Sequence, residues 1–254
     1  MTEAVAVIGS RYLPRGWRDF GRQLAIWFGF LLAYQVVRGV ADRNPTRAFE
    51  NGLWVISAEE HVTGLVELSF QRMVRSSELL TAAVSWTYWQ SEFTVVGLTL
   101  LWVYLRRNEH FYRFRNWILL ANAIGLVGYI AAPTAPPRMF QTFGFDDTLL
   151  TFGTLNHGSG LVELASNPYA AMPSLHAADA FIIGVTMALI VKSRWVKALW
   201  LAWPAWVSFS VMATANHFWL DIAAGFLVAL VAGAIVYRKP LRRTIARRPA
   251  AALR

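Results

Sequence analysis

The chain has 254 residues, of which 56% are hydrophobic and only 15% are charged. Charged residues make up about a quarter of a soluble domain, so this composition excludes an ordinary soluble protein and is typical of a membrane protein. The chain contains no cysteine, which excludes disulfides, thiolate metal sites and a cysteine nucleophile. The net charge of +9 comes from basic residues whose positions fit membrane topology, so we expect no nucleic-acid partner.

The first apolar run covers residues 24–37 and follows a head that carries four arginines. A basic flank before a short apolar run is also the pattern of a cleaved signal peptide, but no clear small-residue cleavage site follows. We therefore expect residues 1–22 to be a cytoplasmic head and the run to be an uncleaved first span.

The segment 41–78 is mixed in polarity and contains no uninterrupted span. We expect one or two amphipathic helices that lie at the membrane surface, the first beginning at Asn44, Pro45 and Thr46.

Five further apolar runs are long enough to cross a membrane, at roughly 20 residues for each crossing. They cover residues 79–105, 116–132, 173–191, 198–213 and 217–237. The first of these five is interrupted in its middle by Gln90, Ser91 and Glu92. The predicted fold class is therefore all-α: a polytopic membrane protein with about six transmembrane helices and one or two interfacial helices. We expect one domain over residues 1–254, with the helical bundle at 24–237 and a basic tail at 238–254.

The basic residues predict how the chain is oriented in the membrane. Four lie in the head, four at 106–115, three at 192–197 and seven in the tail, which together are 18 of the 24 Lys and Arg residues. Six spans place these four segments on one side, and the positive-inside rule makes that side cytoplasmic. We expect a protein of the cell (plasma) membrane with both termini in the cytoplasm. The segment 41–78, the loop 133–172 and the turn between the fifth and sixth spans would share the extracytoplasmic face.

One stretch at that face combines a helix start with a histidine. Pro173 is interpreted as the first residue of a helix, because proline lacks the N–H that would have no partner there. The next N–H groups, from Ser174 to Ala177, would then point out of the helix and bind an anion, so Ser174 and Leu175 are candidate phosphate-binding residues. His176 in the same turn is placed to exchange a proton with the anion. The alternative is an ordinary membrane helix that begins with proline.

A second histidine has a carboxylate four residues further along. The spacing puts His217 and Asp221 on one face of the sixth helix near its outer end. The carboxylate can hold the Nδ1–H of the imidazole and leave Nε2 as a nucleophile. Ionisable residues inside spans are usually functional, but the pair can also stabilise helix packing or bind a metal. No third ligand is obvious, so we expect no metal and no cofactor.

Arg138 is the only Lys or Arg between residues 116 and 191. It follows a segment stiffened by prolines, and its planar guanidinium suits bidentate capture of phosphate. Contact with a lipid headgroup is the alternative.

Taken together, these groups fit phosphoryl transfer through a covalent phosphohistidine. His217 would attack the phosphorus and Asp221 would orient it. His176 would protonate the leaving oxygen, while Arg138 and the region of Ser174 would stabilise the charge on the phosphoryl oxygens.

Two stretches resemble known signatures. Ala-Met-Pro-Ser-Leu-His-Ala-Ala at 171–178 and His-x-x-x-Asp-Ile-Ala-Ala-Gly at 217–225 resemble the second and third signatures of the type 2 phosphatidic acid phosphatase superfamily. Residues 133–138 and 167–176 resemble the branch that includes fungal inositol phosphorylceramide synthase and its bacterial relatives. The resemblance covers residues 88–237. It implies a six-helix membrane fold, metal-independent chemistry on a phosphorylated lipid, and the residue roles given above.

The sequence departs from the superfamily pattern at one glycine position and two cationic positions. Leu175 replaces the glycine that the second signature usually carries, as in the branch named above. Ala131 stands where the first signature has a lysine, and Val211 stands where the third has an arginine. Arg138 and main-chain N–H groups would then suffice, or another cation would be recruited. The candidates for recruitment are Arg38, Arg72 and Arg75.

Two acidic residues have no role in this scheme. Glu92 lies in the middle of a span, and Asp179 lies three residues after His176 on the same helix face. They can bind a polyhydroxyl headgroup such as inositol or a sugar, pair with one of the unassigned arginines, or form a purely structural contact.

The leading functional hypothesis is an enzyme that cleaves or transfers a phosphate ester of a lipid at the outer membrane face. The substrate would be a phospholipid or a polyprenyl phosphate. Water would accept the phosphoryl group in a hydrolase, and an alcohol such as inositol or a sugar in a transferase; both remain open. The competing class is a non-enzymatic lipid-phosphate transporter or scaffold. A transporter would typically show inverted repeats, which the sequence does not.

Overall fold

The computed structural model describes residues 13–41, 44–149 and 168–246, and within these ranges the chain is almost entirely helical, with no named β-strand. The one strand-like feature there is an isolated parallel bridge between Thr134 and Ala170. The helices are α2 (Gly16–Ala41), α3 (Pro45–Val62), α4 (Val66–Arg75), α5 (Glu78–Gln90), η1 (Ser91–Val95), α6 (Val96–Arg106), α7 (Asn108–Ala131), η2 (Pro137–Met139), η3 (Gln141–Phe143), α9 (Leu175–Ile190), α10 (Arg194–Ala213) and α11 (Trp219–Ala246).

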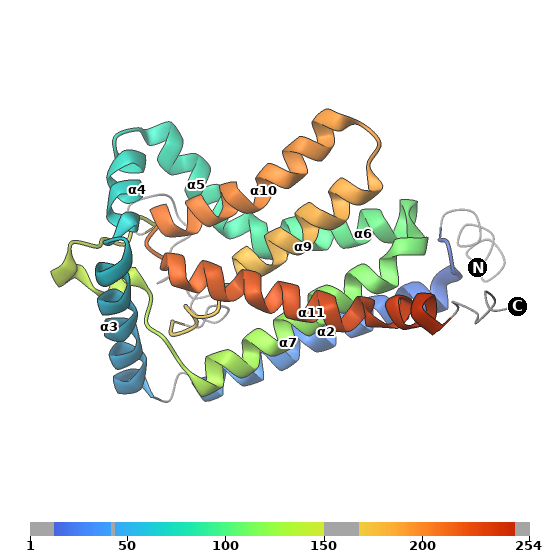
Figure 1. The fold of residues 1–254 in the computed structure, drawn as a ribbon, viewed down its shortest axis with the longest axis horizontal. Helices are drawn as coiled ribbons and strands as arrows, with labels where there is room; N and C mark the ends of the chain where they lie inside the picture. The colour runs from blue at the N-terminus through green and yellow to red at the C-terminus, as the bar shows by residue number, and fades with distance from the viewer. Residues whose placement is uncertain (1–12, 42–43, 150–167, 247–254) are drawn as a thin grey trace, which may run out of the picture.

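Helices α2, α7 and α11 run along the long axis of the molecule, whereas α3 lies across one end of it (Figure 1). Helix α9 occupies the centre, since it packs against α7, α10 and α11. The start of α11 and the short helix η2 lie at the end that α3 covers, and the start of α2 and the end of α11 lie at the opposite end (Figure 1).

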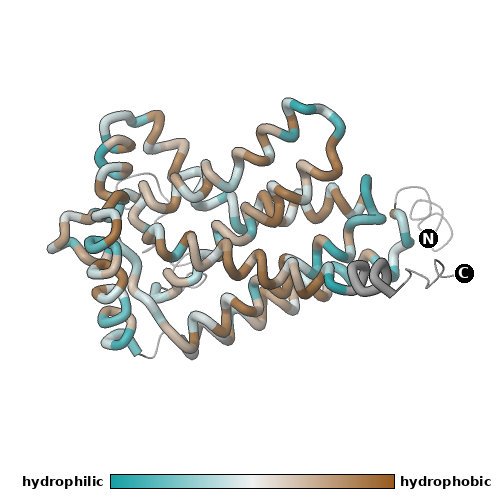
Figure 2. Tube along the Cα trace, in the orientation of Figure 1, coloured by the Kyte–Doolittle hydropathy of each residue, from teal (hydrophilic) through white to brown (hydrophobic). Residues whose placement is uncertain are grey.

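Three helices are long and apolar enough to cross a membrane by length and composition: α7, α10 and the Trp219–Arg238 part of α11. Helix α9 is apolar but shorter. Figure 2 shows hydrophobic residues along these helices and hydrophilic ones at the turn between α9 and α10. The all-α membrane fold is therefore confirmed, while the number of six crossings stays a prediction.

The mixed segment after the first span forms two helices, α3 and α4, as the sequence predicts. Asn44 is the N-cap of α3, because its side-chain oxygen accepts a hydrogen bond from the N–H of Arg47 at 3.2 Å, and Pro45 is the first helical residue. Their location at the membrane surface stays a prediction.

The polar residues that interrupt the second apolar run coincide with a change of helix type. The helix does not end at Gln90, Ser91 and Glu92, because α5 continues through the π-helical turn η1 into α6. A π-turn adds a residue without breaking the helix, so the polar residues are accommodated by a change of register.

Two boundaries differ from the prediction. Helix α7 begins at Asn108, so two of the four basic residues expected in a turn at 106–115, Arg113 and Arg115, lie on its first two turns. The head and tail are partly helical, because α2 begins at Gly16 and α11 extends to Ala246. Residues 1–12 and 247–254 lie outside the described part of the chain.

Candidate active site

The proline-rich segment 133–138 is fixed by its own main chain. The N–H of Ala135 donates to the carbonyl oxygen of Ala48 in α3 at 2.9 Å. The N–H of Arg138 donates to the carbonyl oxygen of Ala215 at 2.8 Å. The segment is therefore held between α3 and the turn that precedes α11, which places the Arg138 side chain beside that turn.

The Arg138 guanidinium is nearly buried, with 10% of its side chain exposed. Its Nη1 donates to Oδ1 of Asn216 at 2.6 Å, and its Nε lies 3.7 Å from Oδ2 of Asp147. Burial lowers the pKa of Arg138 from its ordinary value, while Tyr88 and Asp147 act in the opposite direction. Arginine stays charged despite such a shift. A positive charge is therefore fixed beside Asn216, the residue that immediately precedes His217.

Pro173 is not the first residue of α9, which corrects the sequence interpretation. Ser174 is the N-cap, since its Oγ accepts a hydrogen bond from the N–H of Ala177 at 3.3 Å. The N–H of Ser174 itself donates to the carbonyl oxygen of Asp221 at 2.9 Å. Two of the N–H groups expected to bind an anion are thus already bonded, so this helix start offers less to a phosphate than the sequence predicts.

The side chain of Leu175 points into the protein core, because only 1% of the residue is exposed. Phosphate binding by its main-chain N–H stays a prediction. The side chain covers Gly125 of α7 so closely that a Cβ at Gly125 would lie 2.5 Å from its Cδ2. The leucine that replaces the signature glycine is therefore accommodated by a glycine on another helix.

His217 lies in the turn before α11 and not within the helix, which begins at Trp219. Its Nδ1 is 2.8 Å from the carbonyl oxygen of Ala171 and 3.5 Å from Oδ2 of Asp221. The same carboxylate oxygen accepts a hydrogen bond from the N–H of Phe218 at 2.8 Å. The two residues are close, as predicted, but the closest partner of Nδ1 is a main-chain carbonyl, so the expected orienting role of Asp221 is at most shared.

The second histidine lies beside the first. The ring centroids of His176 and His217 are 5.5 Å apart, and the ring of Tyr88 stacks on His176 at 4.8 Å. Nε2 of His176 is 3.4 Å from Oε2 of Glu92, which the π-turn η1 carries. Each imidazole therefore has one carboxylate neighbour.

Asp179 contacts a side chain of α7. Its Oδ1 accepts a hydrogen bond from Nδ2 of Asn122 at 2.8 Å, and its side chain is buried. A pocket includes Tyr34, Glu92, Asn122 and Asp179 in its lining. The side chain of Arg38, one of the unassigned arginines, lies outside the described part of the structure, so a pairing with it stays a prediction.

Two of the three candidate replacement cations are bonded elsewhere. Arg72 donates to Oγ of Ser69 within its own helix at 3.2 Å, and Arg75 pairs with Asp146 at the surface. The side chain of Arg38 lies outside the described part of the structure. Val211 supplies its carbonyl oxygen to the N–H of His217 at 3.2 Å, so this position supports the turn but brings no charge.

Several residues at this site were missed by sequence reasoning. Tyr88, Asp147 and Asn216 contact the predicted residues directly. Of these, only Asn216 had a sequence signal, since it immediately precedes His217.

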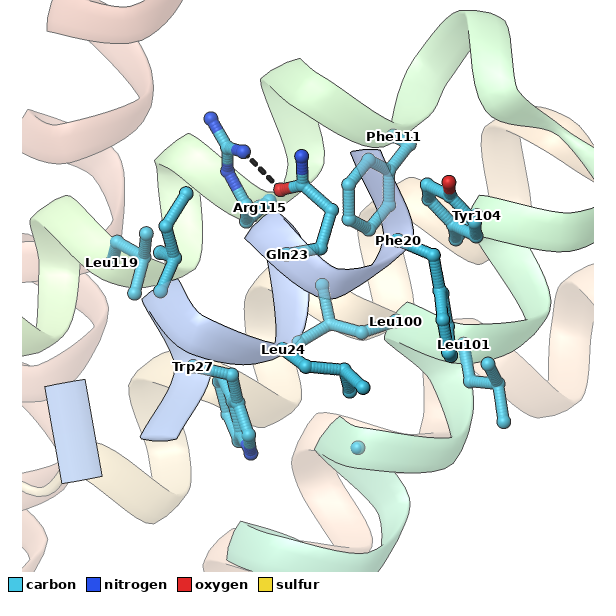
Figure 3. Close-up of a pocket in the computed structure, with 12 residues that line it drawn as sticks. Phe20, Gln23, Leu24, Trp27, Leu100, Leu101, Tyr104, Phe111, Arg115 and Leu119 are labelled. Carbon is cyan, nitrogen blue, oxygen red and sulfur yellow. Dashed lines mark hydrogen bonds between the residues drawn. The ribbon is translucent and has the colours of Figure 1, made fainter. Parts of the chain in front are cut away.

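A pocket of about 540 Å³ lies between α2, α6 and α7, at the end of the bundle near the termini (Figures 1 and 3). Its lining is apolar, and Gln23 accepts a hydrogen bond from Arg115 at its edge. The pocket is separate from the two histidines, which lie toward the opposite end of the molecule.

The sequence of residues 53–235 matches the PAP2 superfamily. This region is most of the chain, so the protein belongs to that superfamily of phosphatases and phosphotransferases. The resemblance stated from the motifs is confirmed.

A curated relative and a solved structure agree with this assignment. The chain is 28% identical over 163 residues to the phosphoinositol dihydroceramide synthase of Bacteroides thetaiotaomicron, which covers 59% of this chain and 52% of the relative. The chain thus spans about half the length of that relative. The fold is similar to that of LpxE from Aquifex aeolicus, with a TM-score of 0.50 and 18% identity over 67% of this chain and 94% of that one.

Proposed function

We propose that the protein transfers the phosphoryl group of a lipid phosphate ester through a covalent phosphohistidine on His217, without a metal ion. The observation that carries this proposal is the pair of adjacent imidazoles with different partners. If Nδ1 of His217 carries the proton and donates it to Ala171, Nε2 keeps a free lone pair for attack.

The first step forms a bond between Nε2 of His217 and phosphorus and breaks the bond between phosphorus and the leaving alcohol oxygen. His176 gives its proton to that oxygen, and the carboxylate of Glu92 stabilises the imidazolium before the transfer. Arg138 lies beside the turn of His217, where its charge can stabilise the phosphoryl oxygens.

In the second step, an incoming hydroxyl attacks the phosphorus, and the bond to Nε2 breaks. His176 accepts the proton of that hydroxyl, which restores the imidazolium for the next cycle. Water in this step makes the protein a hydrolase, and an alcohol makes it a transferase.

The transferase is the second candidate, and one finding favours it. The relative from Bacteroides thetaiotaomicron carries the name of a synthase, phosphoinositol dihydroceramide synthase. The acceptor proposed for this chain is accordingly an alcohol, such as inositol, a sugar or another hydroxylated lipid. The donor is a phospholipid or a polyprenyl phosphate.

We also propose that the protein lies in the plasma membrane with its site on the extracytoplasmic side and both termini in the cytoplasm. The distribution of basic residues supports this orientation.

The test is a substrate screen of the purified protein with phosphatidic acid, polyprenyl phosphates and phosphatidylinositol, each with and without acceptor alcohols and with a chelator. Free phosphate identifies a hydrolase, and a new phosphodiester identifies a transferase. Acid-labile, alkali-stable label on the protein, absent in His217→Ala, is expected for a phosphohistidine. If His217→Ala turns over every lipid phosphate that the wild type does, the nucleophile is wrong. Movement of an intact lipid phosphate without chemistry would support the transporter instead.

A further inference from the structure

Two buried glutamates hold the start of α11, immediately after the histidine. Oε1 of Glu59 in α3 accepts a hydrogen bond from the N–H of Leu220 at 2.9 Å. Oε1 of Glu67 in α4 accepts one from the N–H of Trp219 at 2.7 Å. Both glutamates have no exposed surface. They belong to the two helices whose sequence predicted only contact with the membrane surface.

These bonds complete a set of three. The N–H of Phe218 is bonded to Asp221, so three successive N–H groups after His217 each donate to a different carboxylate. The first N–H groups of a helix have no partner within the helix, and the positive end of its dipole favours negative charge there. The turn that carries His217 is therefore attached to α3 and α4 as well as to its own helix.

The second oxygens of the two glutamates have no donor in the described part of the chain. Oε2 of Glu59 and Oε2 of Glu67 are buried, and among the described residues no N–H or hydroxyl donates to either. The two carboxyl groups lie close enough to act on each other, and repulsion between two buried carboxylates opposes the ionisation of both. A proton on one carboxyl group would let it donate a hydrogen bond to the other.

The charges around the pair favour retention of this proton. Burial raises the pKa of Glu59 to about 8, and the neighbouring Glu67 and Asp221 raise it further by repulsion. Burial also raises the pKa of Glu67, to about 6, with Asp221 acting in the same direction. Main-chain N–H groups act in the opposite direction: that of Leu220 on Glu59, and those of Trp219 and of Glu67 itself on Glu67.

We propose that Glu59 and Glu67 are positioning residues for the nucleophile: joined by one shared proton, they fix the start of α11 and thereby the position of His217. This inference rests on the proposed role of His217. It assigns a catalytic purpose to α3 and α4, which contribute no residue to the signatures.

The isosteric variants test the shared proton directly. In Glu59→Gln, the amide oxygen accepts from Leu220 and the amide N–H₂ donates to Glu67, so the pair keeps one donor and one acceptor. In Glu67→Gln, the amide oxygen accepts from Trp219 and the amide N–H₂ donates to Glu59, provided that Glu59 is ionised. In the double variant both amide oxygens are used by α11, and the two N–H₂ groups face each other without an acceptor. We therefore expect each single variant to keep most of the kcat and the double variant to lose far more than the sum of the two.

The truncation variant tests the positioning. Glu59→Ala should lower kcat by about 100-fold with little change in KM, because a small displacement of a reacting group has an effect of this size. Glu60→Ala, at the exposed neighbouring position, is the matched control and should retain wild-type kcat. A kcat for Glu59→Ala equal to that of Glu60→Ala would overturn the proposal, as would a double glutamine variant no worse than the singles.

A measurement without turnover separates this inference from the proposed function. Hydrogen exchange of residues 218–222 should be slow in the wild type at pH 6.5. After correction for intrinsic exchange rates, these N–H groups should lose protection at pH 9 in the wild type. They should keep it in Glu59→Gln, because a glutamine cannot lose the shared proton. Equal protection in the wild type at both pH values would refute the shared proton even if the enzyme proved to act on a different substrate. If His217→Ala remains active while the exchange behaves as expected, the function fails and the anchoring stands.

Discussion

Nδ1 of His217 lies 2.8 Å from the carbonyl oxygen of Ala171, a residue of the second signature. A carbonyl oxygen only accepts hydrogen bonds, so this contact requires the proton on Nδ1 and leaves Nε2 without one. The two signatures are thus joined by a bond that fixes the tautomer of His217, the proposed nucleophile. Asp221, at 3.5 Å, adds negative charge and supports the turn through Phe218.

This geometry predicts a mild effect for Asp221→Asn. The amide oxygen still accepts from Phe218, and Ala171 still fixes the tautomer. We expect kcat to fall about tenfold, or roughly 1.4 kcal/mol of transition-state stabilisation, from the lost charge alone. Asp221→Ala should lose more, because the N–H of Phe218 then has no partner. A loss of about 10⁴ in Asp221→Asn, as for the aspartate of a protease triad, would mean that Asp221 and not Ala171 orients the ring.

Glu92→Gln should affect substrates according to their leaving group. The imidazolium of His176 loses a charged partner, so protonation of the leaving oxygen is impaired. Acid catalysis contributes about 10²–10⁴-fold, and we expect much of it to be lost for alkyl phosphates. Aryl phosphates leave without a proton and should be nearly unaffected. Thr94→Val, at an exposed position in the same π-turn, is the control. Equal losses for both substrate types would assign Glu92 to another role.

Arg138→Lys should not be conservative. Lysine cannot contact Asn216 and reach Asp147 with one planar group, so the charge is displaced. We expect kcat/KM to fall by about 100-fold, the size of effect seen when one stabilising donor is removed. Arg72→Ala should remain within about twofold of the wild type, because surface substitutions rarely matter and Arg72 contacts only its own helix. If Arg72→Ala is the more damaging variant, the missing signature cation has been recruited from α4.

Gly225→Ala tests the contact between α11 and α9. A Cβ at this position would lie 2.2 Å from the carbonyl oxygen of Ser174, so the helices must separate. We expect a loss of about 1–3 kcal/mol of stability, typical of overpacking, together with loss of activity. Gly97→Ala has no atom within 4 Å of the added group and serves as the matched control in thermal unfolding. Equal midpoints for the two variants would contradict the close contact.

Stability should fall at alkaline pH. The pKa of Glu59 is about 8 in the folded protein against an ordinary value of 4.5, so the folded state keeps a proton that the unfolded chain releases. The resulting stabilisation is complete below pH 4.5 and is lost as the pH rises through 8. The unfolding midpoint should be lower at pH 9 than at pH 6, by about 2–4 °C for each 1 kcal/mol lost. Glu59→Gln should flatten this dependence, and an unchanged dependence in that variant would assign it to other groups.

The sequence predicted the candidate residues more reliably than their contacts. Spacing alone placed His217 near Asp221, because four residues make one helical turn even when the helix begins two residues later. It could not reveal the bond to Ala171, which lies 46 residues away and depends on how α9 meets α11. The predicted start of α9 at Pro173 is two residues too early, because the hydroxyl of Ser174 caps the helix.

The helices were predictable where they are long and apolar, as for α7, α10 and α11. The polar residues at 90–92 marked the place where the helix type changes, but polarity does not report helical register, so the π-turn itself was not predicted. Glu59 and Glu67 were missed entirely, because charged residues on a half-polar helix ordinarily face water. Only the tertiary contact with the start of α11 distinguishes them from exposed neighbours such as Glu60.

The contact between Leu175 and Gly125 gives the second signature a partner on another helix. A bulky residue at the signature position requires a residue without a side chain at the facing position on α7. We therefore expect the two positions to vary together. Related chains that carry leucine in this signature should carry a glycine at the α7 position, and chains with the usual glycine should be free to place a larger residue there. Exchange of the signature between such proteins would then need both positions to be transferred together.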